Sequence, residues 1–308
     1  MEKLTNVFSI VLPVLAGLLL GWYTRRKSIV GDSVIEGIKT LVMRFMLPAV
    51  LLNSFYKTQF NQQLILIALC MFVCCLLGLG LGQLLSRLYA GGGRMLPFLT
   101  CGYEAGMMGY GLYAMLFPAS ETHNFAIVDL GQVLFVFTVY SALLNRQKGV
   151  STKETLQAMV TSPVFLAITI GVALSASGLG GLIHQSWAGA SVDAVLGYIG
   201  APTGMLMIFV VGYQLVLSKA SIKAALATVA LRTLVMIALC AATLLILNQL
   251  TAVSNALFWA LILMFTLPAP FVLPIFSGDE AQKGYIATTL SVGTLFSIGY
   301  FAIISFIR

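Results

Sequence analysis

Two hydrophobic segments are broken at matching positions in the two halves of this chain. The segment 95–117 contains a glycine-rich stretch at 102–111, and the segment 255–276 contains Pro268-Ala269-Pro270. A helix that crosses lipid cannot leave its backbone hydrogen bonds unmade, so such breaks are costly unless the unwound backbone lines a cavity or binds a ligand. Paired breaks, one in each half, are typical of secondary transporters built from inverted repeats.

The composition predicts an all-α polytopic membrane protein. The chain is 59% hydrophobic and 9% charged, with a mean hydropathy of +0.99, whereas soluble domains are about 25% charged. A bilayer crossing needs about 20 apolar residues, and the sequence predicts ten transmembrane helices. The ten predicted segments span approximately 4–24, 34–55, 63–88, 95–117, 124–145, 161–181, 194–217, 223–247, 255–276 and 285–307.

The two halves of the chain correspond to each other through the positions of helix-breaking residues. An offset of about 161 residues aligns segments four and five with nine and ten, and it places Gly109 on Pro270. Because each half has five segments, the second half must be inverted in the membrane. We therefore expect a 5+5 inverted repeat, with residues 1–150 forming the first repeat, residues 151–308 the second, and the two together one transport unit.

The net charge of +7 reflects topology rather than a nucleic-acid partner. If the amino terminus is outside, the inside loops hold eleven basic residues and the outside holds three. The inside residues are Arg25, Arg26, Lys27, Arg87, Arg94, Arg146, Lys148, Lys153, Lys219, Lys223 and Lys283, and the outside residues are Lys3, Lys57 and Arg308. The positive-inside rule then predicts a cytoplasmic-membrane protein with both termini on the extracytoplasmic side.

Enzyme chemistry and metal binding find no support in the sequence. The motifs His-Glu-x-x-His and Gly-x-Ser-x-Gly are absent. The five cysteines lie within hydrophobic segments without histidines at ligand spacing, which favours packing roles. We expect a protein that is not an enzyme and that holds no metal or organic cofactor.

Four stretches in order resemble the auxin efflux carrier family, whose bacterial members are usually described as malate or malonate permeases. They are 45–49 (FMLPA), 106–109 (GMMG), 268–270 (PAP) and 294–297 (TLFS). The resemblance covers essentially the whole chain. It implies ten helices in a 5+5 inverted repeat, broadly similar to sodium/bile-acid symporters. It also implies a transporting bundle with segments four and nine, a scaffold with segments two and seven, and a homodimer through that scaffold.

The chain departs from the family pattern at two positions of the first break. Glu104 stands where the family commonly has asparagine, and Gly111 stands where it commonly has proline. The first departure replaces a neutral polar group with an ionisable one.

Three charged residues lie near the predicted midplane, namely Glu104, Arg44 and Arg232. An ionised side chain there costs about 2.5–3.5 kcal/mol on the lenient insertion scale, so these residues need partners or water. One interpretation is a structural ion pair such as Arg44 with Glu104, and the other is a substrate cavity. Glu36, Thr40 and Arg44 share one helix face, which fits either the cavity or a protomer interface.

The breaks suggest an anion site, because a half-helix that starts at unwound backbone points free N–H groups and its positive end inward. An arginine beside it would suit a carboxylate, and Glu104 would couple transport to protons or ligate Na⁺ with backbone carbonyls. Asp129 and Gln132 either join this ion-coupling site or form a local polar patch. The predicted substrate-binding residues are Glu104, Gly106, Met107, Gly109, Tyr110, Gly111, Thr266, Pro268, Pro270, Arg44 and Arg232.

These features predict a secondary active transporter that moves small organic anions across the bilayer by alternating access, coupled to protons or sodium. Malate- and malonate-like carboxylates are the expected substrates. One alternative is an uncoupled uniporter or exchanger of a larger or aromatic carboxylate. A channel or a transporter-derived sensor is the alternative of a different class, although rings of polar residues typical of a continuous pore are not evident.

Overall fold

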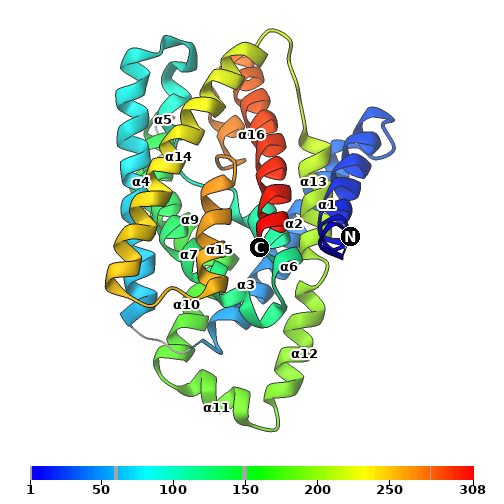
Figure 1. Ribbon diagram of the computed structural model, residues 1–308, viewed down its shortest axis with the longest axis vertical. Helices are drawn as coiled ribbons and strands as arrows, with labels where there is room; N and C mark the ends of the chain where they lie inside the picture. Colours follow the sequence, from blue (N-terminus) through cyan, green and yellow to red (C-terminus); the bar gives the residue numbers. More distant parts are fainter. Residues whose placement is uncertain (1, 59–61, 148–150, 278) are drawn as a thin grey trace.

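The computed structural model describes the chain except for residues 1, 59–61, 148–150 and 278 (Figure 1). Within the described ranges every regular element is a helix, and no β-strand is present. The long helices α4 (Gln62–Leu88), α14 (Ile222–Leu250) and α16 (Glu280–Ile307) run roughly along the long axis of the molecule. The shorter helices α11 (Leu179–Gln185) and α12 (Gly189–Gly200) lie at one end, at the bottom of Figure 1.

Six helical stretches of the described chain are long and apolar enough to cross a membrane. They are Val7–Arg26, Gln62–Leu88, Ala119–Arg146, Gly189–Gln214, Ile222–Leu250 and Glu280–Ile307. Large apolar side chains such as Leu77, Leu234 and Ile237 are exposed on the outer faces of α4 and α14, where lipid rather than protein covers them. The chain is therefore an all-helical, multi-pass membrane protein.

The four other predicted segments are interrupted, which is why they do not qualify as continuous spans. The stretch 34–55 divides into α2 (Asp32–Leu41), the π-helix η1 (Val42–Met46) and α3 (Leu47–Phe55), and it carries several charges. The stretch 161–181 ends in a bend of 85° between α10 (Pro163–Ala176) and α11.

The remaining two interrupted segments are the broken ones at 95–117 and 255–276. In the first, α5 (Leu96–Leu99) is separated from η3 (Ala105–Gly109) and α6 (Tyr110–Leu116). In the second, α15 (Asn255–Thr266) is separated from the short 3₁₀ turn η6 (Leu273–Phe276). Both breaks thus occur where the glycine and proline residues predict them.

The helices form two bundles. In the first bundle, α1 (Glu2–Arg26) packs on α13 (Thr203–Gln214), and α3 packs on α10 and α12. In the second bundle, α4 packs on α5 and α7 (Thr122–Phe135), α14 packs on α15 and α16, and α15 also contacts α7. The bundles meet where α13 contacts η3 and α6 and where α3 contacts α7. The remaining elements are η2 (Ala90–Met95), η4 (Ala119–Glu121), η5 (Val136–Tyr140), α8 (Ser141–Gln147) and α9 (Thr152–Val160).

Candidate functional site

The two breaks cross each other inside the second bundle. At the first break Gly102 has a φ of +66°, a conformation that favours glycine. A Cβ on Gly102 would also lie 3.0 Å from Cγ of Pro270 in the second break. The backbone N–H of Glu104 donates to the carbonyl of Pro268 at 2.9 Å, so the two unwound segments are joined by a direct hydrogen bond. Glycine and proline here permit the crossing as well as the breaks.

The Glu104 carboxylate bridges N–H groups from both breaks. Its Oε1 accepts from the backbone N–H of Met107 at 3.0 Å, and its Oε2 accepts from that of Phe271 at 2.6 Å. The residue is 9% exposed. Backbone N–H groups from both breaks therefore converge at one point, and a carboxylate of the protein itself binds them.

Arg232 of α14 binds the carbonyl groups of the same two breaks. Its Nη1 donates to Leu99 O at 3.0 Å, and its Nη2 donates to Gly102 O at 2.7 Å and to Leu267 O at 3.0 Å. The planar guanidinium carries several N–H donors in a fixed geometry, so this one side chain can bind carbonyls from both unwound segments. Arg232 is 6% exposed. Arg232, which the sequence predicts at mid-depth, therefore donates hydrogen bonds to backbone carbonyls rather than pairing with Glu104.

Asp129 and Gln132 of α7 also bind the first break, through hydrogen bonds to Tyr110 and Tyr103. The Gln132 amide group donates to the carbonyl of Tyr103 at 2.8 Å and accepts from its N–H at 3.3 Å. The Asp129 carboxylate accepts from the hydroxyl of Tyr110 at 3.0 Å and from Gln132 at 3.4 Å. All of these side chains are buried. The structure thus brings the predicted ion-coupling pair to the break that contains Glu104.

Arg44 lies away from this site. It is exposed on η1, and no ion pair joins it to Glu104 in the described part of the chain. The predicted shared face of Glu36, Thr40 and Arg44 assumed continuous α-helical geometry. The π-helix at Val42–Met46 adds a residue to the turn, so α-helical spacing does not hold across this stretch.

The predicted glycines of the first break make close contacts with neighbouring helices. Gly109 packs against Phe125 of α7, where an added Cβ would lie 2.5 Å from Cζ of the ring. Gly111 lies against Gly204 of α13, where its Cβ would be 3.3 Å from Cα of Gly204. An added Cβ on Gly106 would be 3.4 Å from Leu47 of α3. These contacts place the break at the boundary between the two bundles.

Thr266 faces the other side of the second break. Its hydroxyl donates to Leu263 O at 2.7 Å, and the residue lines an apolar crevice of about 360 Å³ between α14, α15 and α16. Thr266 is therefore placed near Arg232 rather than near Glu104, although both lie at the same crossing.

A cavity of about 580 Å³ lies between the bundles at the end of the molecule where α1 ends and α16 begins. We call it the charged cavity, because Arg25, Lys39 and Lys283 line it together with Asp32 and Glu36. Lys39 pairs with Glu36 at 2.9 Å, so the side chains are partly neutralised locally. The remaining lining residues are Ile35, Val211, Tyr213, Gln214, Leu215, Phe271, Pro274, Ala287, Leu290, Ser291 and Thr294. Phe271 connects this cavity to Glu104.

A second cavity, of about 550 Å³, lies between the bundles at the opposite end of α13. We call it the apolar cavity, because most of its lining is apolar, with Tyr110 and Gly111 contributed by α6. The buried hydroxyl of Thr203 and the Oδ1 of Asn53 line it without a hydrogen-bond partner in the described chain. Gly111 and Gly204, which touch each other, form part of its wall.

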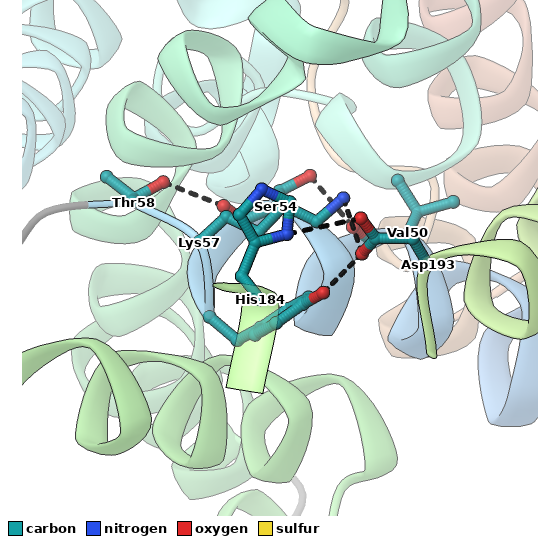
Figure 2. A network of polar contacts seen from close by, with 7 residues as sticks. Val50, Ser54, Lys57, Thr58, His184 and Asp193 are labelled. Carbon is teal, nitrogen blue, oxygen red and sulfur yellow. Dashed lines mark hydrogen bonds and ion pairs between the residues drawn. The ribbon is translucent and has the colours of Figure 1, made fainter. Parts of the chain in front are cut away.

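A separate polar network fastens α11 and α12 to the end of α3 (Figure 2). The Asp193 carboxylate pairs with Lys57 at 2.7 Å and lies 3.3 Å from Nδ1 of His184, and it also accepts from the Tyr56 hydroxyl. His184 has no ionisable residue three or four positions away in the sequence. Its partner Asp193 lies nine residues along the chain, beyond a turn, where helical spacing cannot identify it.

Several groups at the crossing were not predicted. Phe271 N–H and the carbonyls of Leu99 and Leu267 are backbone groups, so side-chain chemistry gave no signal for them. The only signal was the pair of breaks, which predicted free backbone groups without saying which side chain binds each.

Comparisons with known proteins gave no match, either to a family model or to a curated protein.

Proposed function

We propose that this protein is a secondary transporter of small organic anions that works by alternating access. The observation that carries this proposal is the crossing of two broken helices, where a buried carboxylate is bound by backbone N–H groups beside a charged cavity. Unwound backbone inside a membrane protein is typical of substrate and ion sites in transporters. We propose that the crossing is such a site.

Helix packing supports the proposed ten-helix, 5+5 inverted repeat. In such a repeat α1 corresponds to α10, α3 to α13, α4 to α14 and α7 to α16. The pair α1–α13 of one arrangement then corresponds to α10–α3, and the pair α4–α7 corresponds to α14–α16. Both members of each pair are in contact. The pair α4–α5 likewise corresponds to α14–α15. A pseudo-twofold relation between the halves explains all three correspondences.

The positions of the two cavities support alternating access. Both lie between the bundles, and they contact opposite ends of α13, at Val211–Leu215 for the charged cavity and Thr203–Ile208 for the apolar one. Movement of the bundle with the crossing against the other bundle would open one cavity and close the other. The resemblance to auxin efflux carriers favours the same division into scaffold and transporting bundles, with a homodimer formed through the scaffold.

The charged cavity favours an anionic substrate. Its three basic residues outnumber its two acidic ones, and the basic residues would raise the local concentration of a carboxylate. The positive-inside rule places this cavity on the cytoplasmic side of the cytoplasmic membrane, with both termini outside. Malate- and malonate-like carboxylates are the proposed substrates, with protons or sodium as the coupling ion.

The test is uptake of labelled malate and malonate into proteoliposomes that contain the purified protein. An inward proton gradient, an inward sodium gradient and no gradient are compared. Accumulation above equilibrium with one gradient supports a symporter and identifies the ion. Equal uptake that stops at equilibration supports the uniporter or exchanger alternative. The absence of saturable uptake and of counterflow for every carboxylate tested would refute the proposed substrate class.

A further inference from the structure

We propose that Glu104 is a built-in carboxylate that competes with the substrate's carboxylate for the N–H groups of Met107 and Phe271. This proposal rests on the proposed function, since it describes how an organic anion would be bound and released at the crossing. In it, the substrate carboxylate binds only when the Glu104 side chain leaves these two groups.

The contacts of Glu104 are those expected of a bound carboxylate ligand. Each of its oxygens accepts from one backbone N–H, at 3.0 Å from Met107 and 2.6 Å from Phe271. Hydrogen bonds to a charged acceptor are about twice as strong as neutral ones. The two donors come from the two different breaks. A substrate carboxylate that binds both donors would therefore connect the two broken helices, as Glu104 does.

One of the two donors, Phe271, is within reach of a ligand that enters the charged cavity. Phe271 lines that cavity, and so does Lys39 of α2. Gly106 has no side chain, and a Cβ built there would lie 3.9 Å from Oε1 of Glu104. Gly106 therefore lies directly beside the Glu104 carboxylate, with no side chain between them.

Charge balance at the crossing explains why the exchange involves a proton. Two charged side chains lie near the crossing: Lys39 of α2 lines the charged cavity together with Phe271, and Asp129 of α7 is bound by Gln132 beside Tyr103. Arg232 of α14 remains bound to the carbonyls on the other side. If Glu104 takes one proton from water in the charged cavity as one substrate carboxylate replaces it, the net charge at the crossing is unchanged. Each exchanged carboxylate therefore brings one proton.

The experiment uses formate as a minimal carboxylate with purified full-length protein. Replacing Glu104 with alanine removes the built-in ligand and leaves its two donors free. We expect formate to raise the unfolding midpoint of Glu104→Ala saturably by about 5 °C relative to chloride at equal ionic strength. The wild type and the control Glu154→Ala, which lacks an exposed carboxylate of α9 outside the charged cavity, should change by less than about 1 °C at pH 8.

Wild-type protein provides a second measurement that does not depend on the folding of a variant. As the pH is lowered from 8 to 5, formate should begin to stabilise the wild type, because protonated Glu104 competes less well. A formate effect at pH 8 that is the same in wild type and Glu104→Ala, or an effect absent from both at every pH, would overturn the proposal. These results do not depend on transport, so a failure to carry malate in proteoliposomes would refute the proposed function separately.

Discussion

Gly111 of α6 and Gly204 of α13 lie in direct backbone contact across the boundary between the two bundles. A Cβ built on Gly204 would be 3.2 Å from Cα of Gly111, and one built on Gly111 would be 3.3 Å from Cα of Gly204. Because neither residue has a side chain, the helices can approach closely, as small residues allow in membrane proteins. Gly111 thus forms an interhelical contact between α6 and α13.

Gly111→Val should impair transport more than folding. The added side chain meets backbone on α13, so the two bundles must separate at this point. We expect the initial rate of malate uptake in proteoliposomes to fall by about tenfold, equivalent to about 1.4 kcal/mol in the barrier. Gly299→Val is the matched control, because a Cβ on Gly299 of α16 meets nothing within 4 Å. Equal uptake by both variants would show that the α6–α13 contact does not limit movement.

Arg232→Ala should destabilise the protein, because carbonyls of Leu99, Gly102 and Leu267 lose their donor in a buried site. A buried carbonyl left without its donor costs about 1–3 kcal/mol, which thermal unfolding in detergent would report as a lower midpoint. Arg232→Lys, with fewer donors, should recover part of the loss. Arg87→Ala, at an exposed position, is the control. An unchanged midpoint together with a raised apparent KM would instead assign Arg232 to substrate binding.

Glu104→Gln should remove ion coupling while keeping the fold. Its amide oxygen can still accept from one of the two N–H groups, but the side chain no longer exchanges a proton. We expect counterflow of malate to persist and gradient-driven accumulation to disappear. Measurement of both activities on the same vesicles separates these effects. Accumulation against a gradient by the variant would contradict a coupling role for Glu104.

Lys39→Gln should weaken carboxylate binding at the charged cavity. Loss of one positive charge near the crossing should raise the apparent KM for malate by about three- to tenfold, with a smaller effect at high salt. Lys219→Gln is the control, because Lys219 is exposed and does not line the charged cavity. If both variants raise the KM equally, the effect comes from net charge rather than from the cavity.

Tyr110→Phe should affect the first break through Asp129. The lost hydroxyl leaves a buried carboxylate with one fewer donor, at a cost of about 1–3 kcal/mol. We expect a lower unfolding midpoint and a changed pH dependence of uptake. Tyr113→Phe removes a buried hydroxyl that donates to the carbonyl of Ala256 at 3.1 Å, and it should affect stability alone. The same pH profile in both variants would show that Asp129 has no part in coupling.

The sequence by itself determined the class of this protein and the positions of its breaks. Apolar runs as long as a bilayer is thick predict membrane-crossing helices, because backbone polar groups in lipid must be satisfied within a helix. Glycine and proline then identify where helices are interrupted, because these effects are local. Burial of Glu104 and Arg232 could also be predicted, since both lie deep within apolar segments.

Only the tertiary structure decided which groups these charges bind. Glu104 and Arg232 contact backbone groups of two breaks that are more than 150 residues apart in the sequence, and such pairings depend on how the strands cross. Arg44 lies in a π-helical turn, which α-helical spacing does not predict. Side-chain partners are set by three-dimensional packing, whereas the choice between helix and break is made by the residues themselves and by the lipid around them.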